Sequence, residues 1–266
     1  MSCGLKNAGQ RQYIVGGSLS EPGQWPWHVS VRMNGTQFCG GSILSPHLIL
    51  TAAHCFDDLI TSKEAKDWSV TAGDYNFQET EEFEENIQVK KILLHPRFSF
   101  KLISTQSREY VVAKNDVALL QLMRPINVHD KNKGTICLPN NKQILSPKSE
   151  CTITGWGHDS FKGKQTDLLH QAKVPIVSPK DCNSVEAYNN TIHDGLLCAG
   201  NSMGGVDSCN YDSGGSLVCV HNGRWFAQGI ASSGYECARP YAYGLYTRVA
   251  KIKHWIVKTA VEIGEK

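Results

Sequence analysis

The chain has 266 residues, a formal net charge of +2 and no long basic run, which argues against nucleic acid as a partner. It contains no apolar run of about 18 residues, so we expect no membrane-spanning segment. The length allows a substantial core, either in one large all-β domain or in two smaller barrels.

The chain begins with a polar, glycine-containing segment, residues 1–13, that we expect to be a tether and not part of a core. Short runs rich in β-branched and aromatic residues follow, separated by Gly, Pro and Asn turn signals. Many short strands with this punctuation predict antiparallel barrels or a sandwich. The expected strands are His28–Val31, Phe38–Leu44, His47–Thr51, Gln88–Leu94, Val117–Leu122, Cys151–Gly155, Ser216–Val220 and Trp225–Ala231.

The tail of the chain has a helical period. Apolar residues recur there at spacings of three and four residues, with charged residues between them. We therefore expect a terminal helix that docks its apolar stripe on the body of the protein. The stripe consists of Val249, Ile252, Trp255, Ile256, Ala260 and Ile263.

The ten cysteines are spread along the chain, and an even count of this kind predicts a disulfide framework in an oxidising compartment. A zinc-binding protein is the alternative. The chain lacks the paired C-x-x-C spacing of typical zinc ligands, although His54, Cys55 and other cysteines could still form a zinc site. Two glycosylation sequons, at Asn34 and Asn189, agree with a secreted protein. Because no apolar leader precedes them, we expect a domain cut from a longer precursor.

Three short motifs hold residue types suited to nucleophilic catalysis. Ser213 stands between Asp212 and two glycines, His54 follows an apolar run, and Asp116 begins a predicted strand. A serine is a poor nucleophile unless a base takes its proton and donors stabilise the oxyanion. Each residue alone could be an ordinary core or turn residue. Their order along the chain, together with Gly-Trp-Gly at 155–157, makes the set specific.

With these motifs the chain resembles the chymotrypsin/trypsin-type serine proteases, from Ile14 to about residue 258. The resemblance implies that His54 is the general base, Asp116 the residue that orients it and Ser213 the nucleophile. It also implies an all-β fold of two six-stranded antiparallel β-barrels, with the active site between them and a C-terminal helix. An α/β-hydrolase is disfavoured because its triad runs Ser, Asp, His along the chain.

The same resemblance divides the chain into a pro-segment, residues 1–13, and a serine protease domain, residues 14–266. It also pairs all ten cysteines, one pair of which would keep the pro-segment attached after cleavage. The implied bridges are Cys3–Cys137, Cys39–Cys55, Cys151–Cys219, Cys182–Cys198 and Cys209–Cys237.

Activation in this family frees the amine of the residue that matches Ile14, which buries itself against the residue that matches Asp212. The two charges would stabilise each other and order the oxyanion loop and the specificity pocket. The residue before Ile14 is Tyr13, where the family usually has Arg or Lys. We therefore expect activation by a chymotrypsin-like enzyme, or no normal activation.

The resemblance also implies substrate specificity. Asp207 matches the acidic residue at the bottom of the primary specificity pocket, which selects Arg or Lys side chains. Ser208 would add a hydrogen bond to that side chain. Gly234 and Gly244 match glycines of the pocket wall, and Ser232 with Gly234 resembles the segment that pairs with substrate as an extra strand. The expected reaction is peptide hydrolysis after Arg or Lys through an acyl-enzyme, with polypeptide substrates and protein inhibitors as partners.

Several positions depart from the family pattern. Tyr211 replaces a glycine whose N–H, with that of Ser213, forms the oxyanion hole, and glycine's backbone angles are costly for tyrosine. Ser233 replaces a tryptophan that walls the acyl-side subsites, and Ser216 replaces a proline. We expect little consequence from Ser216. Tyr211, Ser233 and Tyr13 support an alternative, a protease-fold homologue with weak or absent activity that acts as a binding protein.

An acidic loop matches the family's calcium-binding loop and offers hard oxygen ligands, although a solvated acidic surface is an equal alternative. No cofactor is required for the reaction, so a calcium ion would be structural. We expect a monomeric domain in which the long segments 56–72 and 97–115 rim and narrow the cleft. The candidate calcium ligands are Asp74, Asn76, Glu79, Glu81 and Glu84.

Overall fold

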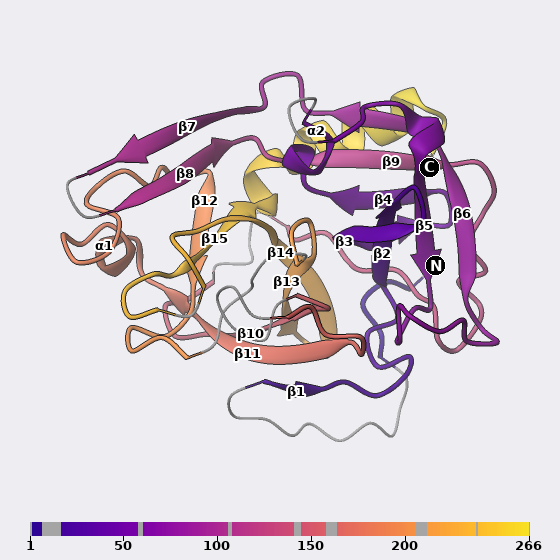
Figure 1. Ribbon diagram of the computed structural model, residues 1–266, viewed down its shortest axis with the longest axis horizontal. Coiled ribbons are helices and arrows are strands. Elements are labelled where there is room, and N and C mark those ends of the chain that lie inside the picture. The colour runs from indigo at the N-terminus through magenta and orange to yellow at the C-terminus, as the bar shows by residue number, and fades with distance from the viewer. Residues whose placement is uncertain are drawn as a thin grey trace.

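Strands dominate the protein. The computed structural model describes residues 2–6, 17–57, 61–105, 108–140, 145–157, 164–205, 212–237 and 239–265. Within these ranges the strands form two closed barrels and a separate hairpin, shown in Figure 1. The predicted barrel fold is therefore confirmed, and the sandwich alternative is wrong.

The first barrel comes from the N-terminal half of the chain. Its six strands are all antiparallel and close in the order β2-β3-β4-β9-β6-β5. Asn34 and Gly35, with φ of 49° and 84°, form the tight turn between the first two strands, as this dipeptide favours. The strands are β2 (His28–Met33), β3 (Thr36–Ser45), β4 (Leu48–Thr51), β5 (Trp68–Ala72), β6 (Glu85–Leu94) and β9 (Ala118–Leu122).

The second barrel comes from the C-terminal half. Its strands run in the order β11-β10-β13-β14-β15-β12, and pairing of β11 with β12 closes the ring. The short strand β1 (Ser18–Leu19) adds to the outer edge of β11. The strands of the ring are β10 (Glu150–Gly155), β11 (His170–Val177), β12 (Leu196–Ala199), β13 (Ser216–His221), β14 (Arg224–Ser233) and β15 (Gly244–Arg248).

Helices are few. Two 3-10 turns, η1 (Ala53–Phe56) and η2 (Ala65–Asp67), belong to the first barrel, and the short α1 (Pro179–Cys182) belongs to the second. The predicted terminal helix is confirmed as α2 (Val249–Glu262), with its apolar side chains Val249, Ile252 and Ile256 buried. Among the described helices, none combines the length and the apolar character needed to cross a bilayer.

The two barrels share a core. Trp25 packs edge-on against Trp27 and Trp225, with ring centroids 5.8 and 5.1 Å away. Because Trp225 belongs to β14 and the other two rings precede β2, this contact joins the barrels. Buried aromatic clusters of this kind contribute strongly to stability.

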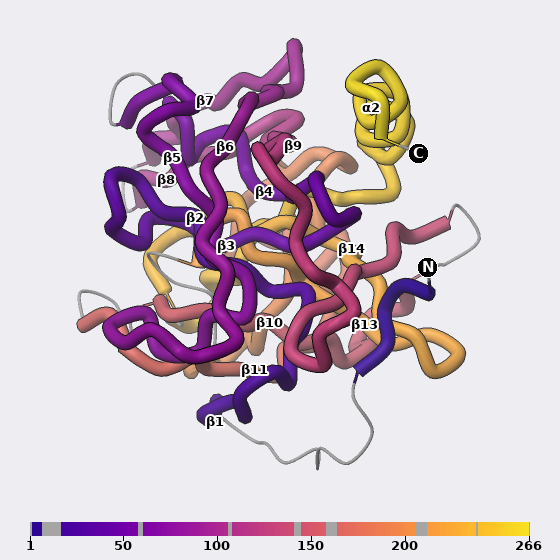
Figure 2. The backbone as a smooth tube through the Cα atoms, turned by 90° about the vertical axis from the view of Figure 1, so that its right-hand side faces the viewer, coloured from indigo at the N-terminus to yellow at the C-terminus, as the bar shows by residue number. Residues whose placement is uncertain are grey.

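The N-terminal segment 2–6 is packed against the body, beside β13 and β14 (Figure 2). Gly4 donates its N–H to the carbonyl of Thr135 at 2.7 Å and accepts a hydrogen bond from Trp225 N at 2.9 Å. The ammonium of Lys6 lies 3.2 Å from the ring centroid of Trp25. This part of the expected tether is therefore docked on the shared core, which its polar sequence did not indicate.

Every predicted strand is present, with ends that differ by a few residues. The strands that the sequence did not predict include the hairpin of β7 (Ser99–Ser104) and β8 (Glu109–Lys114). This hairpin leaves the first barrel and lies beside the second (Figure 1).

Candidate active site

His54 and Asp116 meet in the first barrel. His54 lies on η1, directly after β4, and Asp116 lies directly before β9, which pairs with β4. Nδ1 of His54 is 2.8 Å from Oδ2 of Asp116, and the backbone N–H of His54 donates to Oδ1 at 2.9 Å. The two contacts fix both the carboxylate and the imidazole, leaving Nε2 as the ring nitrogen available to a substrate or a nucleophile.

The charges of this pair support each other. The side chain of Asp116 is 0% exposed and that of His54 is 30% exposed. Burial opposes the charge on His54, but the Asp116 carboxylate outweighs it and raises the pKa of the imidazole. Burial also opposes ionisation of Asp116, yet the charge and hydrogen bonds of His54 lower the pKa of that carboxyl group. A neutral His54 beside ionised Asp116 is thus a stronger base than a free imidazole.

Ser232 connects the pair to the second barrel. It lies near the end of β14, and its hydroxyl donates to Oδ2 of Asp116, the oxygen that also faces His54. Asp116 is therefore held from both barrels. The sequence placed Ser232 in the substrate-binding segment and did not indicate this contact.

The backbone around Ser213 is fixed against the strands that lead to His54. Gly40 N donates to Ser213 O at 2.8 Å, and Gly214 N donates to Ala231 O at 2.9 Å. Gly214 has φ of 81°, and a Cβ there would lie only 2.2 Å from Oγ1 of Thr51. Glycine is thus required for the close approach of the serine turn to the end of β4.

The three residues that the motifs singled out therefore all lie at the boundary between the barrels. His54 and Asp116 come from the first barrel, and Ser213 lies three residues before the strand β13 of the second. Two hydrogen bonds cross this boundary: Gly40 of the first barrel donates to Ser213, and Ser232 of the second barrel donates to Asp116.

Asp212, which precedes the serine, is enclosed by the Gly-Trp-Gly motif. Gly157 N donates to its Oδ1 at 2.8 Å. A Cβ on Gly155 would lie 1.8 Å from the same oxygen, so no larger residue fits there. The proposed activation partner of this carboxylate, Ile14, lies outside the described residues, as does Tyr13.

Four of the five implied disulfides are confirmed, namely Cys3–Cys137, Cys39–Cys55, Cys151–Cys219 and Cys182–Cys198. Cys237 is also disulfide-bonded, and its implied partner, Cys209, lies outside the described residues. The zinc alternative is wrong, because the sulfur atoms of Cys39 and Cys55 beside His54 are bonded to each other.

The specificity pocket is only partly described. Asp207, Ser208 and Tyr211 lie outside the described residues, so their predicted roles stay predictions. Gly244 begins β15 and is buried, whereas Gly234 follows β14 and is half-buried. Gly234 lies two residues beyond Ser232 in the chain.

The acidic loop brings together three of its five candidate ligands. Carboxylate oxygens of Asp74, Glu81 and Glu84 all lie within 4.8 Å of one another, and Glu81 also accepts the N–H of Asn76 at 2.9 Å. Glu79 is exposed. Burial, reinforced by Glu81 and Asp74, raises the pKa of Glu84 to about 8.

One oxygen atom of each of these three carboxyl groups is buried without a hydrogen-bond partner among the described residues. Arg32 offsets part of the negative charge through an ion pair with Asp74 at 2.7 Å. Buried, unpartnered carboxylate oxygens are costly unless a proton or a cation satisfies them. The donor set therefore fits a hard cation such as calcium.

Both sequons lie on exposed turns. Asn34 has φ of 49° in the β2–β3 turn, and Asn189 has φ of 43° in the loop after α1. Exposed turns are accessible to glycosylation, so both remain candidate sites.

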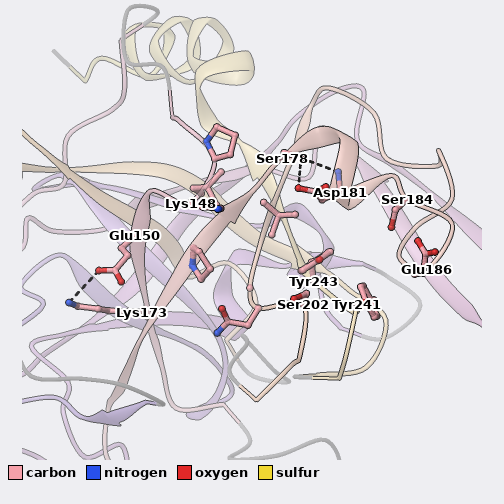
Figure 3. A pocket seen from close by; sticks show the side chains of 16 residues that line it. Lys148, Glu150, Lys173, Ser178, Asp181, Ser184, Glu186, Ser202, Tyr241 and Tyr243 are labelled. Carbon is pink, nitrogen blue, oxygen red and sulfur yellow. Dashed lines mark hydrogen bonds and ion pairs between the residues drawn. The ribbon is translucent and has the colours of Figure 1, made fainter.

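A separate pocket of about 910 Å³ lies on the outer side of the second barrel, and Figure 3 shows its polar lining. Lys173 and Glu150 form an ion pair of 3.6 Å at one end, and Ser178 caps α1 at the other by accepting the N–H of Asp181. None of His54, Asp116 and Ser213 lines this pocket, so it is distinct from the candidate active site.

The sequence missed several residues that hold the site together. Ser216, judged a minor replacement of proline, shares a hydrogen bond of 2.8 Å with Ser42 across the barrel boundary. Buried His28 contacts Oγ1 of Thr154 at 3.1 Å, also across that boundary. These contacts join residues more than a hundred positions apart, so no local sequence signal could have found them.

Comparison with known proteins agrees with this geometry. A family model described as Trypsin matches residues 14–256. A curated relative, mouse transmembrane protease serine 11C, is 36% identical over 256 residues, which is 96% of this chain and 55% of that protein. The chain thus spans about half the length of this relative. On the family match and the barrel fold, the chain belongs to the trypsin family of serine proteases.

Proposed function

We propose that the protein is a secreted serine endopeptidase that hydrolyses peptide bonds after Arg or Lys. The observation that carries this proposal is the fixed unit of His54, Asp116 and Ser232 beside the anchored turn of Ser213. A base oriented by a buried carboxylate next to a serine turn is the arrangement that acyl transfer needs.

In the proposed reaction, His54 Nε2 takes the proton of Ser213 Oγ as the oxygen attacks the scissile carbonyl. Asp116, kept ionised by its hydrogen bonds, stabilises the imidazolium that forms. His54 then gives the proton to the leaving amine, and an acyl-enzyme remains. A water molecule, activated by the same imidazole, hydrolyses the acyl-enzyme and restores the serine.

Specificity for Arg or Lys rests on Asp207. A carboxylate at the base of a narrow pocket is costly until a cation enters, which favours basic substrate side chains. The buried Gly244 is consistent with a pocket wall that admits a long side chain. The oxyanion would be stabilised by the N–H groups of Tyr211 and Ser213.

The disulfides support the proposed secreted location. Four bridges among the described residues suit an oxidising, extracellular setting. Exposed Asn34 and Asn189 would carry glycans there. The bridge Cys3–Cys137 would keep the pro-segment attached to the protease domain after cleavage before Ile14.

The second candidate function is a protease-fold binding protein with weak or absent activity. Tyr211 in the oxyanion loop and Tyr13 before the activation site favour it. Loss of one oxyanion donor reduces the rate by roughly 10²–10³-fold, so a strained Tyr211 amide would bring low turnover without loss of binding.

We also propose that calcium binds the acidic loop as a structural ion. Asp74, Glu81 and Glu84 would hold it through their unpartnered buried oxygens, with oxygen atoms of Asn76 and Glu79 as further ligands. The ion would neutralise the carboxyl groups and stabilise the edge of the first barrel between β5 and β6.

The test uses protein cut after Tyr13 and small esters that differ only in an Arg, Lys or Phe acyl-side residue. We expect a burst of product and a preference for Arg and Lys over Phe of at least about 100-fold in kcat/KM. The Asp207→Ser variant should lose this preference, whereas Asp194→Ser, which alters an exposed acid elsewhere, should keep it. Equal rates for the three esters would contradict the specificity, and no hydrolysis would favour the binding protein.

A further inference from the structure

The hairpin β7–β8 comes from the first barrel but packs on the second. Its six paired positions run from Ser99 opposite Lys114 to Ser104 opposite Glu109. It follows β6, and its second strand ends just before Asn115 and Asp116. The hairpin is therefore attached at its base to the candidate active site.

Tyr110 anchors the hairpin in the second barrel. Its side chain is only 5% exposed, and its ring lies edge-on to Tyr188 with 5.1 Å between centroids. The Tyr110 hydroxyl is 3.2 Å from Tyr188 O and 2.9 Å from Oγ1 of Thr191. Val112 joins the same apolar cluster. A buried, hydrogen-bonded tyrosine of this kind holds the strand in one position.

Arg108, at the turn of the hairpin, adds a second anchor. Its Nη1 donates to Ala187 O at 2.9 Å, and its guanidinium carbon lies 5.2 Å from the ring centroid of Tyr235. Cation–π contact and a charged hydrogen bond both favour this position. Tyr235 therefore faces the hairpin.

The segment that Arg108 and Tyr110 face consists of the end of β14 and the residues that follow it. It runs from Ser232, which contacts Asp116, through Ser233 and Gly234 to Tyr235. The hydroxyl oxygen of Ser233 is buried and has no hydrogen-bond partner among the described residues. β8 and β14 are in contact, so the hairpin lies alongside this segment.

A bound substrate strand would run antiparallel to this segment. Opposing residues in an antiparallel pair advance together, one against one. Substrate residues on the acyl side are counted from the scissile bond toward the N-terminus of the substrate. If the first of them pairs beside Ser232, the third pairs beside Gly234. The fourth residue then arrives beside Tyr235, where Arg108 and Tyr110 already pack.

We propose that the docked β7–β8 hairpin closes the acyl side of the cleft after about the third substrate residue. The preferred substrates are peptides with a short stretch of chain before the Arg or Lys that is cut. This inference rests on the proposed function and adds to it a limit on substrate length. Arg108 and Tyr110 are specificity-determining residues in this proposal.

The experiment measures kcat/KM for a series of peptides with Arg at the cleavage point and one to five residues on its acyl side. In the unaltered sequence, cut after Tyr13, the third residue should raise kcat/KM. The fourth and fifth residues should change it by less than about twofold. In Arg108→Ala and in the milder Tyr110→Phe, the fourth and fifth residues should raise it at least about fivefold.

The matched control is Arg224→Ala. Arg224 also donates to a backbone carbonyl, that of Cys3, but it lies at the far end of β14. This variant should behave like the unaltered sequence. A rise of fivefold or more with the fourth residue in the unaltered sequence would overturn the proposal, and so would length profiles identical in all variants.

Binding separates this proposal from the proposed function. If no peptide is cut, the proposed function fails, and affinities of the same peptides for the Ser213→Ala protein are compared by calorimetry. Closure by the hairpin is supported if Ser213→Ala binds peptides with three and with five acyl-side residues equally well. The same protein with Arg108→Ala added should bind the longer peptide more tightly. Tighter binding of the longer peptide without that substitution overturns it, as does binding of none of the peptides to any variant.

Discussion

Ser232 donates its hydroxyl to Asp116 across the boundary between the two barrels. The accepting oxygen, Oδ2, is the one that also faces Nδ1 of His54 at 2.8 Å. The position of the base in the first barrel thus depends on a residue of the second. Docking of the barrels and orientation of the base are coupled through one carboxylate oxygen.

Ser232→Ala should weaken catalysis without abolishing it. A hydrogen bond to a charged group contributes about 1.5–3 kcal/mol, and we expect kcat/KM to fall about 10-fold. With one donor lost, the Asp116 carboxylate attracts the His54 imidazolium more strongly. The acid limb of the pH–rate profile should therefore move to higher pH. The control is Ser45→Ala, which removes a hydroxyl donor to Glu265 far from the site. An unchanged pH profile in Ser232→Ala would show that the contact does not orient the pair.

Asp116→Asn should lower kcat by about 10⁴-fold, the loss established for the matching change in this family. Asp116 raises the pKa of His54 above the ordinary 6.5, so the acid limb of the profile should lie above pH 6.5 and move down in the variant. The stabilisation from this pair is fully present below pH 6.5 and is lost as pH rises through the folded pKa. The control Asp194→Asn alters an exposed acid. An acid limb at the same pH in Asp116→Asn and in the unaltered protein would contradict the pairing of Asp116 with His54.

Gly214→Ala should displace the serine turn. Its Cβ would lie 2.2 Å from Thr51 Oγ1 and 2.6 Å from Gly40 O, and φ is 81°. Gly223 has a similar φ of 73° but nothing within 4 Å of its Cβ position, so Gly223→Ala carries the backbone cost alone. That cost is about 1–2 kcal/mol. Urea unfolding should show a clearly larger loss for Gly214→Ala, together with loss of activity. Equal losses in the two variants would contradict the packing of the turn against β4.

The acidic loop predicts a pH-dependent response to calcium. The pKa of Glu84 is raised from 4.5 to about 8, so the folded chain holds a proton that the unfolded chain releases between these values. Without calcium, stability should therefore decrease as pH rises from 4.5 to about 8. Calcium displaces the proton, so the increase in Tm on adding calcium should be larger at pH 8 than at pH 6.

The matched variants for this test are Glu84→Gln and Glu82→Gln. The first should remove most of the calcium response and its pH dependence. The second, at an exposed neighbour, should leave both unchanged. A calcium response that survives in Glu84→Gln would place the ion elsewhere. An equal increase in Tm on adding magnesium would show that the effect is not specific to calcium.

The sequence predicted the strands and the site motifs because both are local patterns, whereas the two barrels followed from the resemblance to the family. β2 has valines at alternate positions, β9 is a compact apolar run, and the serine motif is contiguous. β11 was missed because Lys173 and Pro175 interrupt its apolar pattern, and proline is rare inside strands. Tertiary pairing with β10 outweighs that local signal.

The hairpin could not be predicted for a different reason. All of β7 except Ile103 is exposed, so the strand has no buried face and shows no alternation. β8 is held by Tyr110, whose partner Tyr188 lies 78 positions away. The sequence indicated a long segment at the cleft rim, but only the contacts of Arg108 and Tyr110 explain where it lies.

The most direct test of the proposed function is labelling with a phosphonate that carries an Arg side chain. The protein is cut after Tyr13, incubated with the reagent and digested for mass spectrometry. We expect close to one label per chain, on Ser213, and none in His54→Ala or in the uncut chain. The control Ser45→Ala should label normally. No label on Ser213 in the cut, folded protein would contradict a working nucleophile.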